Sequence, residues 1–125
     1  MRSTLLVFIG SGIGGAARHL VGFASLRLLG PNFPYGTLAI NIAGSALMGL
    51  VAGLFAAFGS GNHDLRLFLA TGIIGGFTTW STFTLDAVTL WERGQPVAAL
   101  AYVLGSLIAS FALMAAVLVM ARRWM

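Results

Sequence analysis

The sequence has no cysteine and no lysine, and only 8% of its 125 residues are charged. The absence of cysteine excludes a disulfide framework and a thiolate metal site, and the absence of lysine excludes a Walker-type phosphate loop. Soluble domains carry about 25% charged residues, so this chain cannot cover a surface that faces water. The basic residues give a net charge of +4, but they are scattered singly, which argues against nucleic acid as a partner.

Groups for catalysis are equally scarce. His19 and His63 are the only histidines, and Asp64, Asp86 and Glu92 are the only acids. No histidine and acid have the spacing of a metal site, and no serine, histidine and acid can be placed as a catalytic set. We therefore expect neither an enzyme nor an organic cofactor.

Long apolar runs are what the chain does have, since 58% of it is hydrophobic. A bilayer core needs roughly 20 apolar helical residues, and four segments are long enough: 4–29, 36–58, 67–91 and 96–121. Short polar connectors separate them at 30–35, 59–66 and 92–95. We predict an all-α, multi-pass membrane protein, a single four-helix transmembrane domain over residues 1–125. The first run resembles a secretory signal, but its apolar pattern continues past a cleavage point, so we predict a retained helix.

Four spans place both termini on one side of the membrane. The arginines then divide four to two: Arg2, Arg66, Arg122 and Arg123 against Arg27 and Arg93. This weak bias allows termini in the cytoplasm, and it also allows insertion in both directions, which makes an antiparallel dimer possible. Small residues four apart, such as Gly10 and Gly14 or Gly72 and Gly76, predict close helix packing. Because four short helices enclose little space, we expect any pathway at a subunit interface.

The third apolar run, 67–91, contains residues of low helix propensity, which disfavour a continuous helix. A glycine pair, Gly75 and Gly76, precedes five hydroxyl residues within seven positions. We predict a break between Gly75 and Thr79, where freed carbonyls can hold a cation. The alternative is an unbroken helix whose serines and threonines bond back to their own carbonyls.

Polar side chains also recur on the second and fourth runs. Thr37 and Asn41 are four apart and share a face. The Asn41 amide either joins helices or offers its N–H donors to an anion. Tyr102, Ser106 and Ser110 form a second stripe, which is either interhelical hydrogen bonding or a polar pathway.

Aromatic and charged residues complete the candidates. Trp80 and Phe83 are three apart on one face; they are either core, or they point their positive ring edges at an anion. Arg18 and Asp86 are charges inside the runs, which is costly unless they are paired or hydrated. Arg18 is either an anion attractor, or it forms an ion pair or joins helices through its guanidinium.

Three motifs, in this order, resemble the bacterial fluoride channels of the Fluc (CrcB) family. They are residues 14–18 (GGAAR), 36–41 (GTLAIN) and 71–83 (TGIIGGFTTWSTF). The resemblance covers nearly the whole chain, and the third motif is specific. The chain departs from the family at three positions. Trp80 stands where the first pore phenylalanine is usual, Met114 where threonine is common, and Asp86 where glutamate is usual.

The resemblance implies a dual-topology antiparallel homodimer in the bacterial inner membrane that confers fluoride resistance by passive export. It implies fluoride pores along the subunit interface and a structural sodium ion held by the carbonyls of Gly75 and Thr78. The implied pore residues are Asn41, Trp80, Phe83, Ser81, Thr37, Ser106, Ser110 and Tyr102, with Arg18 in the vestibule. The alternatives are a small multidrug-type proton-coupled antiporter of organic cations and a non-transporting assembly subunit. Such antiporters rely on a carboxylate in the first span, where this chain has Arg18 and no acid.

Overall fold

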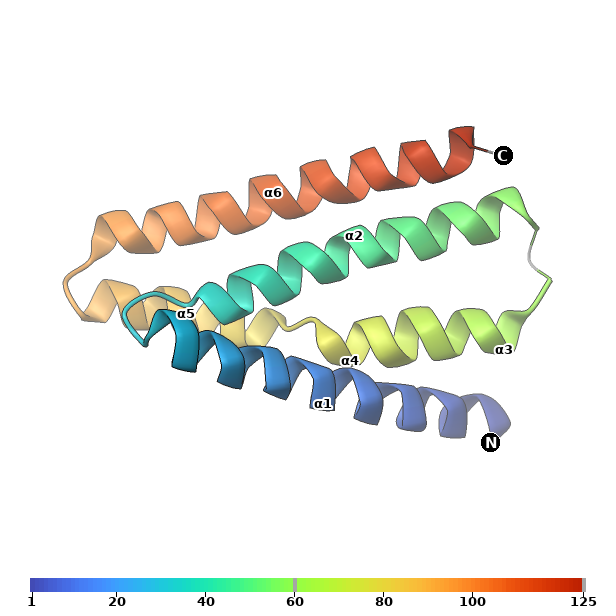
Figure 1. The fold of residues 1–125 in the computed structure, drawn as a ribbon, viewed down its shortest axis with the longest axis horizontal. Coiled ribbons are helices and arrows are strands. Elements are labelled where there is room, and N and C mark those ends of the chain that lie inside the picture. Colours follow the sequence, from blue (N-terminus) through green and yellow to red (C-terminus); the bar gives the residue numbers. More distant parts are fainter. Residues whose placement is uncertain (60, 125) are drawn as a thin grey trace.

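The structure, a computed structural model, describes residues 1–59 and 61–124, and within these ranges it is helical and contains no strand. Three long helices frame a series of four shorter helical segments (Figure 1). In chain order the elements are α1 (Arg2–Leu29), α2 (Tyr35–Ala57), α3 (His63–Arg66), η1 (Leu67–Ile74), α4 (Gly75–Phe77), α5 (Trp80–Glu92) and α6 (Pro96–Arg123).

The helices α1, α2 and α6 are each long and apolar enough to cross a membrane, which confirms the prediction of an all-α membrane protein. The third predicted run consists of η1, α4 and α5 placed end to end (Figure 1). The predicted connector 59–66 is too long, because His63–Arg66 is helical. The Asn62 side chain accepts a hydrogen bond from the Leu65 N–H at 3.0 Å and starts that helix earlier than hydropathy indicates.

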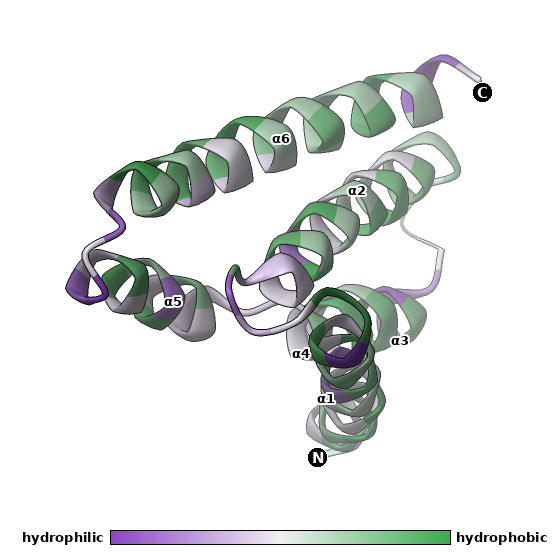
Figure 2. Ribbon diagram, turned by 60° about the vertical axis from the view of Figure 1, so that its left-hand side comes forward, coloured by the Kyte–Doolittle hydropathy of each residue, from purple (hydrophilic) through white to green (hydrophobic). Residues whose placement is uncertain are grey.

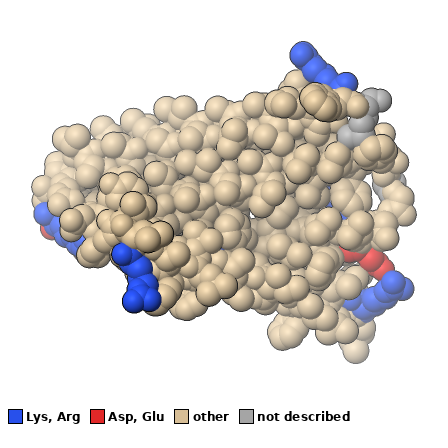
Figure 3. Space-filling view, in the orientation of Figure 1, with Lys and Arg blue, Asp and Glu red and all other residues tan. Residues whose placement is uncertain are grey.

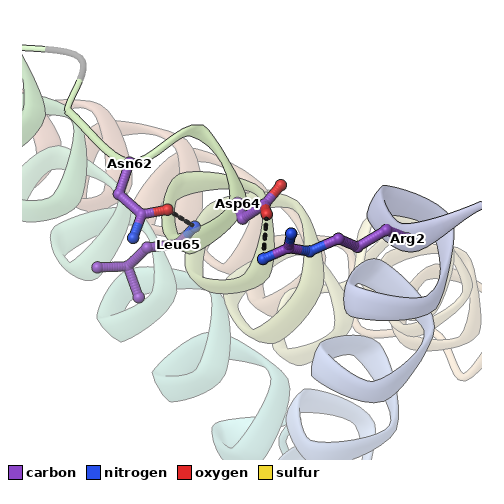
Figure 4. Close-up of polar contacts among 4 residues, drawn as sticks. All are labelled: Arg2, Asn62, Asp64 and Leu65. Atoms are coloured by element: carbon purple, nitrogen blue, oxygen red, sulfur yellow. Dashed lines mark hydrogen bonds and ion pairs between the residues drawn. The ribbon is translucent and has the colours of Figure 1, made fainter.

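Two pairs of elements lie side by side. The helix α2 runs along α6, and α1 runs along η1 and α4, while α5 packs below the first half of α6 (Figure 1). The start of α1, the end of α6 and the adjoining ends of α2 and α3 lie at the same end of the molecule (Figure 1). At that end Arg2 pairs with Asp64 at 3.0 Å, beside the Asn62 cap (Figure 4).

Glycines close the contact between α1 and the η1–α4 segment, as predicted. A Cβ placed on Gly10 would lie 2.8 Å from a backbone oxygen of η1, and one on Gly76 would lie 2.6 Å from the Ser11 carbonyl oxygen. A Cβ on Gly14 would collide with the Ile73 carbonyl. The backbones therefore touch directly, which is how helices associate in lipid. We call this contact the glycine seam.

Hydrophobic side chains mostly face outward. The principal buried cluster, Phe83, Leu90, Ala99 and Tyr102, lies between α5 and α6, whereas large apolar residues such as Phe8 and Phe111 are about three-quarters exposed. Apolar colour covers the helices along their lengths (Figure 2), and charged atoms gather toward the two ends of the visible face (Figure 3). This distribution suits a hydrocarbon surrounding and not water.

Candidate functional site

Regular helix stops at two residues of the third run. The segment α4 ends at Phe77, and Thr78 and Thr79 are extended, with φ −75° and ψ 157° and with φ −150° and ψ 117°. The Thr79 hydroxyl then caps α5 by accepting a hydrogen bond from the Thr82 N–H at 3.2 Å. The Thr78 hydroxyl bonds back to the Ile74 carbonyl at 3.1 Å. Thr78 thus bonds to the helix that ends before it, and Thr79 caps the helix that begins after it.

Asn41 of α2 holds the extended residues in place. Its Nδ2 donates to the Thr79 carbonyl at 2.9 Å, and its Oδ1 accepts from the Thr79 N–H at 2.9 Å. One amide therefore satisfies both polar groups of a residue that has left the helix. Three residues further along α2, a Cβ on Gly44 would collide with the Thr78 methyl group, so only glycine admits this approach. The sequence left two roles open for Asn41, and the structure shows the one in which it joins two helices. The second N–H of its amide makes no hydrogen bond to Thr79.

The hydrogen bonds of Asn41 and of the Thr79 hydroxyl also leave the Gly75 and Thr78 carbonyls without their helical donors. In a continuous α-helix the Thr79 N–H would donate to Gly75, and the Thr82 N–H would donate to Thr78. Here Asn41 and the Thr79 hydroxyl receive these N–H groups instead. The Gly75 and Thr78 carbonyls thus lose their helical donors, as carbonyls at unwound cation sites do. Within residues 1–59 and 61–124, no cluster of acids and histidines offers a rival cation site.

A cavity of about 300 Å³ lies beside the extended residues, between α2, α5 and α6. It brings together six of the residues singled out in the sequence: Asn41, Thr78, Trp80, Phe83, Ser106 and Ser110. Gly44, Ser45, Thr79, Met114 and apolar side chains complete its wall. We call this space the central cavity. Its polar groups are few and lie on an apolar lining, which is the usual composition of a small-ligand site.

Aromatic rings extend from the central cavity into the protein. The centroids of Trp80 and Phe83 are 5.1 Å apart, and those of Phe83 and Tyr102 are 5.2 Å apart. Phe83 is 5% exposed and Trp80 is 69% exposed, so Phe83 is both core and cavity wall. Phe33, which the sequence did not single out, meets Tyr102 edge-on at 5.6 Å. Phe33 lies in a connector without helical periodicity, so no pattern could have identified it.

The serines of α6 line the cavity opposite Asn41. Ser106 is 4% exposed, and its Oγ has no hydrogen-bond partner among the residues that the structure describes. A buried hydroxyl without a partner destabilises a fold by about 1–3 kcal/mol. Ser110, one turn further along α6, is half-buried on the same cavity wall. The arrangement offers an unused donor to whatever enters the cavity.

A second cavity of about 420 Å³ lies at the end where α1 connects to α2. Thr37 and Asp86 line it, together with His19 and Arg93. The Tyr102 hydroxyl donates to Asp86 Oδ2 at 3.1 Å, and Tyr102 is buried, so its ring fills the space between the two cavities. Thr37 and Tyr102 are therefore separated from the serines of the central cavity, which their spacing alone did not indicate.

Three further candidates line neither cavity. Gly75 is exposed on the short segment α4, and Ser81 is exposed on α5, where its carbonyl accepts from the Thr84 hydroxyl at 2.9 Å. Arg18 is half-buried on α1. It forms no ion pair with Asp86 in the described ranges, where the one salt bridge found is that of Arg2. The roles expected of these residues stay predictions.

Comparison with known proteins identifies the family. The family model described as "CrcB-like protein, Camphor Resistance (CrcB)" matches residues 5–118. The chain belongs to this family. A CrcB-family protein of Methylobacterium nodulans is 54% identical over 124 residues, which are 99% of each chain.

Two more relatives are similarly close. A protein of Mesorhizobium japonicum is 55% identical over 108 residues, 86% of each chain, and one of Agrobacterium fabrum is 50% identical over 122 residues, 98% of each chain. All three relatives carry the name "Fluoride-specific ion channel FluC".

Proposed function

We propose that this chain is a passive fluoride-selective channel that exports fluoride from the bacterial cytoplasm across the inner membrane. The observation that carries the proposal is the central cavity, where unused N–H and O–H donors and aromatic edges converge beside extended backbone. The names of the relatives support the same ion. In this account the protein catalyses no reaction.

Conduction of fluoride requires replacement of its tightly held water by donors of the pore. In the proposed path the second Asn41 N–H and the hydroxyls of Ser106 and Ser110 take that role, and the ring edges of Trp80 and Phe83 add positive potential. The ring edges solvate the ion without a full opposing charge, so the ion is bound well enough to enter and loosely enough to leave. Thr37 continues the polar lining in the second cavity, with Tyr102 between the two cavities. Ser81, which lines neither cavity in the single chain, would face the subunit interface, and Arg18 would attract anions in the vestibule.

A second copy of the chain, inserted in the opposite direction, completes the pores. Extended backbone at membrane depth must be covered by protein or line a cavity, yet Trp80 is 69% exposed and Gly75 is exposed in the single chain. Lipid cannot satisfy a glycine carbonyl that has lost its donor. An antiparallel homodimer that places the extended residues at mid-membrane, with pores along its interface, satisfies both requirements.

A structural sodium ion fits the same place. The Gly75 and Thr78 carbonyls of the two subunits would hold it, since both carbonyls have lost their helical donors. The ion would supply positive charge to carbonyl oxygens that have lost their helical donors. The chain's own part is to keep those donors engaged elsewhere, on Asn41 and on the Thr79 hydroxyl.

A small multidrug-type antiporter has no comparable support. The helix α1 contains no acidic residue, and Asp86, the one acid of the third run that lines a cavity, bonds Tyr102. The proposal requires no coupled proton. The electrochemical gradient of fluoride alone drives transport.

Efflux from liposomes that contain only this protein tests the proposal. We expect fluoride efflux, followed with a fluoride electrode, and no matching chloride efflux. Phe83→Leu keeps an apolar side chain but removes the ring edge, so we expect fluoride efflux about tenfold slower, the change that a barrier raised by about 1.4 kcal/mol gives. Trp80→Phe, measured in parallel, reports what the indole contributes. Equal chloride and fluoride efflux from the wild-type protein would contradict the proposal.

A further inference from the structure

We infer that Asn41 is a positioning residue for the cation site, in addition to lining the central cavity. Its Oδ1 takes the Thr79 N–H at 2.9 Å, and this single hydrogen bond has two consequences for the carbonyls proposed to hold sodium. The inference rests on the proposed sodium site, and its test separates the two.

The first consequence concerns the direction of the Thr78 carbonyl. The Thr78 C=O and the Thr79 N–H belong to one planar trans peptide, in which they point in opposite directions. Because the Thr79 N–H points at Asn41, the Thr78 carbonyl points away from Asn41 and from α2. The peptide plane thus presents its donor to the cavity wall and its acceptor to the opposite side. A cation there would also polarise the peptide and strengthen the bond to Asn41.

The second consequence concerns the Gly75 carbonyl. The Thr79 N–H is the group that would satisfy it in a continuous helix, and Asn41 removes that donor. The bond from Nδ2 to the Thr79 carbonyl at 2.9 Å keeps the residue extended, so the helix cannot close again. One amide on α2 therefore both aims one proposed ligand and frees the other.

Different side chains at position 41 separate these effects. Alanine has no acceptor, so the Thr79 N–H can return to Gly75 and the peptide plane can turn. Aspartate keeps an acceptor for that N–H, and thus the direction of the Thr78 carbonyl, but it loses the Nδ2 donor to the Thr79 carbonyl and brings a negative charge to the cavity. We expect both variants to weaken sodium binding, Asn41→Ala more than Asn41→Asp, and the charge of Asn41→Asp to slow fluoride efflux.

Thermal unfolding of the purified full-length protein measures sodium binding without transport. Sodium chloride replaces N-methyl-D-glucamine chloride at constant ionic strength, and a bound ion raises the unfolding temperature according to its concentration relative to Kd. For Asn41→Ala, the sodium concentration needed to raise the unfolding temperature by a given amount should increase by about 10–100-fold. This is the usual effect on affinity of losing a partner that orients metal ligands. Ser45→Ala is the matched control, because Ser45 lines the same cavity one turn further along α2; its sodium response should equal that of the wild type.

The outcomes distinguish the inference from the proposal beneath it. A wild-type sodium response in Asn41→Ala would overturn the inference and leave the sodium site intact. Absence of any sodium response in the wild-type protein would overturn both. Fluoride efflux that failed in the wild-type protein while the sodium response persisted would overturn the proposed function alone.

A measurement on the wild-type protein covers the case in which Asn41→Ala does not fold. Amide hydrogen exchange at Thr79 should slow when sodium is added, because its N–H is held by Asn41 on the peptide whose carbonyl takes the ion. Exchange at residues of the glycine seam near Gly10 should change less. Equal exchange at Thr79 with and without sodium would overturn the inference.

Discussion

The η1–α4–α5 series has two different sides. Toward α1 it forms the glycine seam, where Gly10, Gly14 and Gly76 bring backbones into direct contact. Toward α2 and α6 it meets Asn41 and Ser106 and leaves a cavity of about 300 Å³. Small residues serve both sides, but one side is closed and the other keeps space and unused donors. The seam glycines therefore serve packing, whereas the proposed function belongs to the side where polar side chains face a gap.

The glycine seam should be the more sensitive side to added volume. Gly14→Ala places a Cβ against the Ile73 carbonyl, so we expect a loss of at least about 1–3 kcal/mol in unfolding free energy. Gly12→Ala is the matched control, because a Cβ there meets nothing within 4 Å and alanine favours a helix by about 0.8–1.0 kcal/mol over glycine. Thermal unfolding in detergent measures both. Equal effects at the two positions would show that the seam does not hold the fold.

The cavity side should separate stability from transport. Ser106→Ala removes a buried hydroxyl that has no partner in the described part of the chain, so we expect unfolding free energy to rise by about 1 kcal/mol. Fluoride efflux should fall, because one of the donors that replace water is lost. Thermal unfolding and liposome efflux on one preparation give both values. A variant that is less stable but conducts at the wild-type rate would assign Ser106 to packing.

The smallest effect is expected at the end of the molecule, away from both sides. Arg2 and Asp64 pair at 3.0 Å, but their side chains are 84% and 32% exposed, and exposed ion pairs contribute about 0–1 kcal/mol. Arg2→Gln should therefore lower unfolding free energy by less than about 1 kcal/mol, and added salt should shrink the difference. Thermal unfolding at low and high salt checks this. A larger loss that salt leaves unchanged would mean that α1 depends on this pair for docking.

Sequence patterns predicted the long helices, but they did not predict the specific side-chain contacts between them. Hydropathy predicted α1, α2 and α6, and the spacing of small residues predicted the glycine seam. The pairing of Asn41 with Thr79 spans 38 residues and depends on the register between two helices, which no local pattern contains. The π-helical winding of Leu67–Ile74 likewise has no counterpart in the sequence pattern.

The stripe on α6 shows a related limit. Tyr102, Ser106 and Ser110 share a face, as their spacing requires, but the tyrosine side chain is long enough to reach Asp86 on α5. It therefore fills the space between the two cavities, whereas the short serines line one of them. Residue spacing predicts which face of a helix a side chain lies on. The length of the side chain then decides which residues of a neighbouring helix it can contact.

Whether the path is passive and selective for fluoride is decided by the reversal potential of the purified protein in a planar bilayer. With a fluoride gradient, equal chloride on both sides and a pH gradient of either sign, the current should reverse at the fluoride equilibrium potential. Reversal that ignored the fluoride gradient, or that moved with the pH gradient, would contradict a passive, fluoride-selective path.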